Sequence, residues 1–379
     1  WDVSNVTKMS SMFNGATSFN QPIGDWNTSA VANLQAMFYG GSSFNKDIGD
    51  WDTSSVIALN AMFNGASSFN QPLGNWNTSS VSKMEQMFSG ASAFNQTCGD
   101  WNISLVTNMQ DMFKNANSLS NSNKGETHKT FSSNSNWPYS SWSAYAVYTP
   151  IIDSNFQTAV NLWFSDEANA TYTYGHISDW NVSVVTDMSN AFKQRSTFNE
   201  DISGWDVSGV TNMVRIFYEA SSFNKDISNW DISSVTTLNG AFRGADAFNQ
   251  AIGNWNTSAV TDINYLFAGA DSFNQNIGNW NISNVRSMIG SFRFTDSFNQ
   301  DLSNWDTSSV ENMALAFELA QGFNQDISDW NTSSVTNITD IFQNTSALSD
   351  TTKGLIHEAF SSNQNWSYDW RQHVVIDNS

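Results

Sequence analysis

The chain has 379 residues, 40% of them hydrophobic, so it is long enough to bury a large core. Only 13% are charged, and 35 acidic against 15 basic residues give a formal net charge of −20. This charge repels phosphate and so argues against nucleic acid as a partner, while no apolar run reaches the roughly 20 residues of a membrane helix. The chain starts at Trp1 inside a repeat and shows no signal peptide, so we expect a processed product or a segment of a longer chain.

One unit of 25 residues recurs along the chain, which predicts a stack of coils rather than a globular enzyme. With its Trp counted as repeat position 0, every unit has Ser at position 3, Val at position 5 and Phe at position 12. Position 18 is Phe in ten units, each followed by Asn at position 19. The repeated tryptophans are Trp1, Trp26, Trp51, Trp76, Trp101, Trp180, Trp205, Trp230, Trp255, Trp280, Trp305 and Trp330.

Within each unit, positions 3, 5, 8 and 12 have the spacing of one helical face, so we expect a short helix there. A Ser or Asx residue would cap its start, and a Gly near position 14, as at Gly15 and Gly40, would end it. We expect the second half to be extended and to form a parallel sheet with neighbouring coils at the roughly 4.8 Å strand spacing. The expected fold class is therefore an α/β repeat solenoid, with short parallel strands on one face and short helices on the other.

A lone unit cannot fold, because about six large apolar side chains do not offset the ordering entropy of its backbone. Stacking would align identical residues into ladders of Trp, Phe, Val and Asn. For the Asn ladder at position 19 we expect a structural role, in which the side-chain amides satisfy turn backbone groups of successive coils. Position 11 is Met throughout the first run of units but varies in the second, so the two runs are expected to differ in packing or in what they touch.

In chain order, residues 1–142 form a first array of five coils with a C-terminal cap, and 143–151 form a linker. Residues 152–379 form a second array, in which a helix over 153–164 caps seven coils before a C-terminal cap and tail. The two C-terminal caps are predicted from similar sequences, LSNSNKGETHKTFSSNSNWPY over 119–139 and LSDTTKGLIHEAFSSNQNWSY over 348–368. Tyr172, Tyr174 and Ile177 are expected to lead into the first coil of the second array.

No catalytic constellation is visible. The four histidines lie in caps or tails without ligand-like spacing, and we expect His128 and His357, at matched cap positions, to be structural. Cys98 is the single cysteine and replaces an aliphatic residue, so a buried hydrophobe is favoured over a reactive thiol or an interchain bridge. We predict no enzyme activity and no cofactor.

Stacked carboxylates make calcium a candidate ligand. They fall at position 21 of neighbouring coils, where carboxylates about 5 Å apart would repel each other unless a cation or solvent intervened. Because Pro22, Pro72 and Ala251 share this position, the calcium hypothesis is the weaker of the two readings. The candidate ligands are Asp201, Asp226, Asp301 and Asp326.

Thirteen Asn-X-Ser/Thr sequons occur, seven of them at position 1. Five other units carry Asp at position 1, which indicates that an Asx turn is required there and that the invariant Ser completes a sequon by coincidence. In a secreted eukaryotic protein these asparagines would be glycosylation candidates. They are Asn5, Asn27, Asn77, Asn95, Asn102, Asn169, Asn181, Asn256, Asn281, Asn331, Asn337, Asn344 and Asn365.

The unit MFNGATSFNQPIGDWNTSAVANLQAMF and the cap pattern KG..H..FSSN.NW resemble the BspA-type bacterial surface-protein repeat, a divergent relative of leucine-rich repeats. The resemblance covers nearly the whole chain. It implies a leucine-rich-repeat-like solenoid that is extracellular or on the cell surface and is associated with adhesion, aggregation and binding of host or matrix proteins. It supplies no catalytic residues, and the repeat consensus does not define binding residues.

Two functions remain open. The first is a structural or adhesive surface scaffold that assembles with copies of itself, including into a filament, or with other surface proteins. The second is a binding module for glycans or matrix proteins. It would be recognised by variable polar residues outside the ladders that build one patch, such as Lys46, Glu200, Lys225 and Gln250 at position 20. An ice-binding face is disfavoured, because position 6 carries no unbroken rank of Thr.

Overall fold

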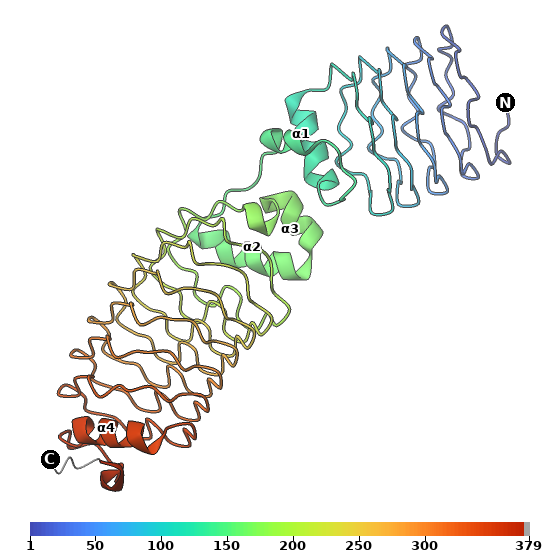
Figure 1. The fold of residues 1–379 in the computed structure, drawn as a ribbon. Helices are drawn as coiled ribbons and strands as arrows, with labels where there is room; N and C mark the ends of the chain where they lie inside the picture. The colour runs from blue at the N-terminus through green and yellow to red at the C-terminus, as the bar shows by residue number, and fades with distance from the viewer. Residues whose placement is uncertain (375–379) are drawn as a thin grey trace. The chain divides into compact units, whose positions relative to one another are not determined.

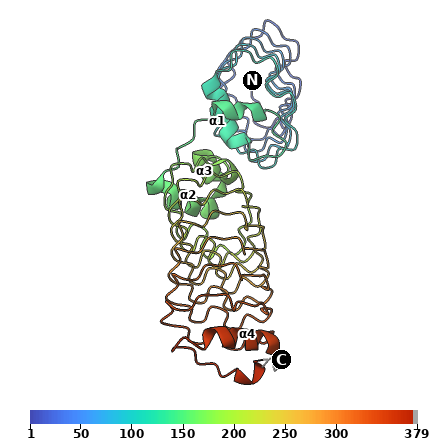
Figure 2. The same cartoon turned by 60° about the vertical axis from the view of Figure 1, so that its left-hand side comes forward.

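A computed structural model describes residues 1–374, and these divide into two compact units, each a stack of coils (Figures 1 and 2). Unit 1 comprises Trp1–Thr149 with Asp166–Gly175, and unit 2 comprises Pro150–Ser165 with the chain from His176 onward. The end of the predicted C-terminal tail, 375–379, lies outside the described residues. The helical segments are α1 Asn121–Phe131, η1 Ser140–Tyr145, α2 Asp153–Ser165, α3 Glu167–Tyr174, η2 Ile177–Asp179, α4 Asp350–Phe360 and η3 Arg371–His373.

The helix predicted in each coil is wrong. Over residues 1–374, all helical segments lie in the caps and connections, and the coils are built of turns. Backbone donors alternate between local and inter-coil acceptors: Met12 N donates to Met9 O at 3.2 Å, whereas Phe13 N donates to Met37 O in the next coil at 2.9 Å. A helix would use every donor within its own coil, so stacking and helix formation compete for the same groups.

Neighbouring coils pair in parallel, as predicted, but within residues 1–374 they do so through isolated bridges rather than a sheet, and in a different half of the unit. Neighbouring coils share one isolated parallel bridge at position 7, for example Lys8 with Asn33 and Asn33 with Ala58. Position 7 lies in the half predicted to be helical. The glycine near position 14 does not end a helix; it adopts a positive φ within the alternating turns, as at Gly65 with φ 72°.

The predicted aromatic ladders are confirmed. The Trp26 and Trp51 rings stack with centroids 6.3 Å apart, and Trp51 Nε1 donates to Ile23 O at 3.0 Å. Within a coil, Phe63 stacks on Phe69 at 4.0 Å. The interior coils bury their Trp and Phe rings and also position 11, so the replacement of Met by Ala, Ile, Leu or Ser there alters the core rather than the surface.

The predicted Asn ladder is confirmed as well. Asn45 Oδ1 accepts Asn70 N at 2.9 Å, and Asn70 Oδ1 accepts Asn95 N at 2.8 Å. The glutamines at position 20 join this network, since Gln71 and Gln250 each donate Nε2 to the ladder asparagine of the preceding coil. Of the residues predicted to build a variable binding patch, Gln250 therefore has a structural role, while a patch that includes Lys46, Glu200 and Lys225 stays a prediction.

Each C-terminal cap supplies the contacts that a further coil would have made. In unit 1, Ser120 N donates to Asn95 Oδ1, continuing the Asn ladder, while Ser120 Oγ caps α1. Phe113 N donates to Tyr139 Oη at 2.8 Å, and Asn134 Nδ2 donates to two carbonyl oxygens of the last coil. In unit 2 the same roles fall to Ser349, Tyr368 and Asn363 around α4. The two caps are therefore equivalent, as predicted.

The Lys-Gly pair of the cap sequence has a packing reason. A Cβ on Gly125 would lie 2.2 Å from Tyr145 O, and one on Gly354 would lie 2.2 Å from His373 O. The 3-10 segment after each cap helix thus crosses that helix where only glycine fits.

At the start of unit 2, α2 covers the first coil as predicted, with Phe156, Val160 and Trp163 buried. The expected array boundary differs at one place. Residues 166–175, which include Tyr172 and Tyr174 and were expected in the second array, belong to unit 1, because α3 packs against α1.

Candidate functional site

The position 1 residues form Asx turns along one edge of each stack, as predicted. Asn27 Oδ1 accepts Ser29 N at 3.2 Å, and Asp52 Oδ1 accepts Ser54 N at 3.0 Å. Asp and Asn serve equally because the turn needs only a side-chain oxygen. The bonds from Ser54 lower the pKa of Asp52, since they favour its charged form.

All four calcium candidates have a local partner of the same kind, the backbone N–H of the serine two residues later. Asp201 Oδ1 accepts Ser203 N at 3.0 Å, and Asp226 Oδ1 accepts Ser228 N at 2.9 Å. Hydrogen bonds from the following serine lower the pKa of Asp201, Asp226 and Asp301. Within residues 1–374, no group of three or more His, Cys, Asp or Glu side chains is placed to hold a metal ion. Calcium binding stays a prediction, and calorimetric titration of calcium-stripped protein with calcium would test it.

The sequon asparagines are exposed, except Asn95 and Asn337, which are half-buried. Asn95 belongs to the Asn ladder, where its Oδ1 accepts Ser120 N. A glycan on Asn95 would disrupt that ladder, whereas the position 1 asparagines are exposed at the stack edge. Comparing the intact mass of the purified protein with the sequence mass of 42.1 kDa measures whether glycans are attached.

The cap histidines have structural partners, as predicted. Trp137 Nε1 donates to His128 Nδ1 at 3.1 Å, and Trp366 Nε1 donates to His357 Nδ1 at 3.0 Å. Burial lowers the pKa of His128 by disfavouring its charged form.

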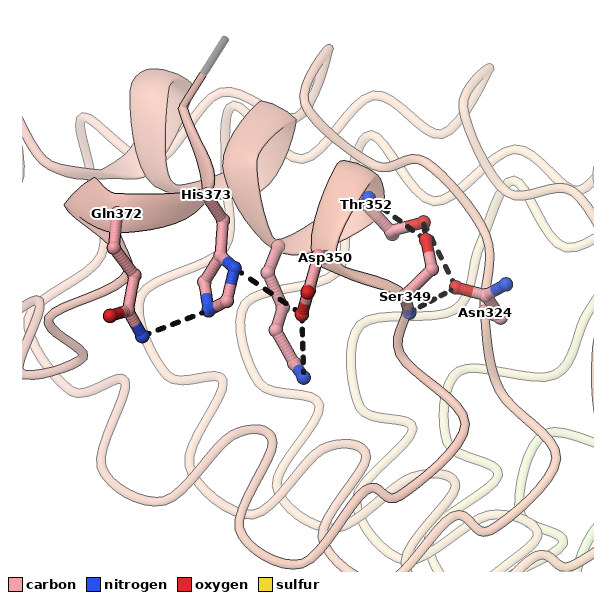
Figure 3. Close-up of polar contacts among 7 residues, drawn as sticks. Asn324, Ser349, Asp350, Thr352, Gln372 and His373 are labelled. Atoms are coloured by element: carbon pink, nitrogen blue, oxygen red, sulfur yellow. Dashed lines mark hydrogen bonds and ion pairs between the residues drawn. The ribbon is translucent and has the colours of Figure 1, made fainter.

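Two polar groups lie at α4, one of Ser349 with Asn324 and Thr352 and the other of Asp350 with His373 (Figure 3). Ser349 N donates to Asn324 Oδ1 at 2.9 Å, and Ser349 Oγ accepts Thr352 N at 3.1 Å. His373 Nδ1 lies 3.2 Å from Asp350 Oδ1 and forms an ion pair when protonated. The contacts of Ser349 are those of a helix cap, not of a nucleophile activated by a base.

Each unit has a cleft between its cap and its last coil. The cleft of unit 1 has a volume of about 680 Å³, and that of unit 2 about 590 Å³. Equivalent residues line both, among them Asn102 and Asn134 in unit 1 and Asn331 and Asn363 in unit 2. The side-chain amides of the cap asparagines donate hydrogen bonds to carbonyl oxygens of the last coil. The clefts therefore follow from the way in which the cap covers that coil.

Cys98 is buried, as expected for a hydrophobic replacement at its position. Burial raises the pKa of its thiol, and the nearby charge of Asp100 adds to this. Cys98 therefore stays protonated, and a protonated thiol is a poor nucleophile.

No helix within residues 1–374 has both the length and the apolar character to cross a membrane. No curated protein and no solved structure gives a significant match to the chain. A family model described as "Mycoplasma protein of unknown function, DUF285" matches four segments, 1–56, 46–144, 158–277 and 236–355. The matched segments contain the coils of both units, so the chain belongs to this family of tandem-repeat proteins.

Proposed function

We propose that this chain is a non-enzymatic, leucine-rich-repeat-like scaffold of the BspA type, which works outside the cell or on its surface as a structural or adhesive element. The observation that carries the proposal is the use of the repeated polar groups. The recurrent Asn, Ser and Gln side chains bond to turns and to neighbouring coils, as Asn45 and Gln71 do. Consensus residues of this kind build a stack and leave recognition to its variable edges.

The repeat architecture supports the scaffold role through its shape. Stability of a coil stack is close to a sum over neighbours, so length can be added coil by coil. The partners we propose are copies of the same chain, including a filament, and other surface or matrix proteins or glycans.

Beads coated with the protein test adhesion, with heat-unfolded protein as the control coating. We expect the folded coating to hold beads on surfaces that carry the protein itself or immobilised matrix proteins. Negative-stain microscopy of concentrated protein tests assembly in parallel. Dispersed monomers together with beads that behave like the unfolded control would refute the proposal.

A further inference from the structure

Unit 2 carries four arginines on one edge. All six arginines of the chain lie after residue 190, and four of them fall at positions 10, 13 or 15 of their coils. Three of these four arginines alternate with aromatic rings along successive coils. We call this set the arginine–aromatic ridge; it consists of Arg215, Tyr218, Arg243, Tyr265, Arg293 and Phe294.

Cation–π contacts link the ridge. The Arg243 guanidinium carbon lies 5.4 Å from the Tyr218 ring centroid and 5.2 Å from that of Tyr265. Arg215 lies 5.9 Å from the Tyr218 ring, and Arg293 lies 4.6 Å from Phe294. Stacking on a ring holds the planar guanidinium and reduces the entropy that it would lose on binding an anion.

Small residues make room for the ridge at position 10. A Cβ on Gly240 would lie 3.3 Å from Arg215 Cγ, and one on Gly290 would lie 2.7 Å from Tyr265 Cε1. Large and small residues therefore alternate from coil to coil, so that each large side chain lies over the glycine of the next coil. The ridge is a packed surface rather than a row of independent side chains.

Three ridge residues occupy repeat positions 10 and 14, which have a positive φ in every coil. Arg215, Tyr265 and Phe294 have φ values of 55°, 54° and 59°, in the left-handed region that disfavours residues other than glycine. Phe294 is 43% exposed at position 14, where Gly65 and most other coils of unit 1 carry glycine. Because every coil has a positive φ at these positions, the conformation itself belongs to the repeat, and the feature particular to the ridge is an exposed aromatic ring on this edge.

The same edge of unit 1 provides a natural contrast. It carries no arginine, and its residues at position 10 are small, polar or acidic. These are Ser11, Ala36, Ala61, Gln86 and Asp111. The ridge is thus not part of the repeat consensus, and the requirement to fold does not explain it.

We propose that the arginine–aromatic ridge binds a linear acidic polysaccharide through carboxylate or sulfate groups. The guanidinium groups would form charge-assisted, bidentate hydrogen bonds to the acid groups, and the rings would pack against sugar faces. This inference rests on the proposed function, in which glycans are one class of partner, and names the chemical class of glycan and the edge of unit 2 that would bind it.

The spacing and charge of the ridge favour a polysaccharide over nucleic acid. Successive coils lie 5.6 and 5.8 Å apart at the stacked Phe242, Phe267 and Phe292 rings, and the ridge offers about one cation per one or two coils. Duplex DNA carries one negative charge per about 1.7 Å of its axis. Glu318 pairs with Arg293, and Glu219 also lies on this edge, so the surface suits sparse acid groups interspersed with hydroxyl groups.

The test measures binding of hyaluronan and heparin oligosaccharides by biolayer interferometry, with neutral dextran, polyglutamate and single-stranded DNA for comparison. The variant R215Q/R243Q removes two ridge arginines. The matched control R286Q/R371Q removes two arginines outside the ridge, each of them ion-paired and exposed. A third variant, Y265G, removes a ring and restores the residue found at Gly240 and Gly290. Thermal melting checks that all variants fold.

We expect an acidic oligosaccharide to bind and dextran not to bind. R215Q/R243Q should weaken binding by at least about tenfold and flatten its salt dependence, while the control stays within about threefold of wild type. Y265G should weaken binding without changing the salt slope. The proposal is overturned by absence of oligosaccharide binding, by equal losses in the two double variants, or by tighter binding of polyglutamate or DNA, which would assign the ridge to an acidic protein or a nucleic acid.

Discussion

The Asn ladder gives the sharpest prediction about what holds the coils together. Asn70 is half-buried, and its Oδ1 accepts Asn95 N at 2.8 Å and Gln96 Nε2 at 3.0 Å. The substitution N70A removes both bonds and leaves the Asn95 amide without its acceptor. With about 1 kcal/mol for each lost bond and a further cost for the unsatisfied amide, we expect a destabilisation of about 2–3 kcal/mol. N70D keeps the accepting oxygen and should cost less than about 1 kcal/mol.

Hydrogen exchange followed by mass spectrometry measures this locally, because neighbouring coils open together. A cost of about 2–3 kcal/mol corresponds to roughly 30- to 150-fold faster exchange of the Asn95 amide in N70A. S68A serves as the control, because Ser68 is exposed in the same turn. If N70A and S68A exchange and melt alike, the ladder does not stabilise the stack and the reasoning fails.

Three further predictions concern glycine, cysteine and pH. G65A should lower the free energy of unfolding by about 1–2 kcal/mol, because Gly65 has a φ of +72°. The control G74A, at a site without positive φ, should melt like wild type. Equal melting of the two variants would contradict this. Cys98 should resist a thiol reagent at pH 8 until denaturant is added, since burial raises the pKa of its thiol; stoichiometric labelling of native protein would count against it. Burial, and then the charges of Asp296 and Asp246, raise the pKa of Asp271. A carboxyl whose pKa is raised in the folded state costs stability once it ionises, so stability is lost as pH rises through that pKa. D271N should therefore raise the Tm at pH 7 but not at pH 3. A Tm shift of the same size at both pH values would show that ionisation of Asp271 is not the cause.

The features that depend only on which residue type recurs at a given position of the 25-residue repeat could be predicted from the sequence. The Trp and Phe ladders, the Asn ladder and the two equivalent caps were all predicted, because stacking puts the same residue at the same place in each coil. The Asx turn at position 1 was predicted from the exchange of Asp and Asn, since both provide the same oxygen.

The conformation of the coil could not be predicted in this way. The spacing of Val31, Leu34 and Phe38 fits a helical face, but it also fits consecutive turns of four residues. Which one forms is decided by whether a donor such as Phe38 N finds its acceptor within the coil or in the next one, and here it bonds to Met62 O. That acceptor exists only once coils are stacked.

The ridge likewise depended on the tertiary structure. Arg215 and Arg243 occupy different repeat positions and lie 28 residues apart, so the 25-residue register does not align them. Only the stack brings Arg243 against the ring of Tyr218, which Arg215 of the same coil also contacts, and only the backbone shows that positions 10 and 14, which carry Tyr265 and Phe294, have a positive φ. The sequence by itself determined the repeat, its ladders and its caps, because these follow from one residue type at one spacing. The coil backbone and the binding edge were decided by contacts between coils, which exist only in the folded stack.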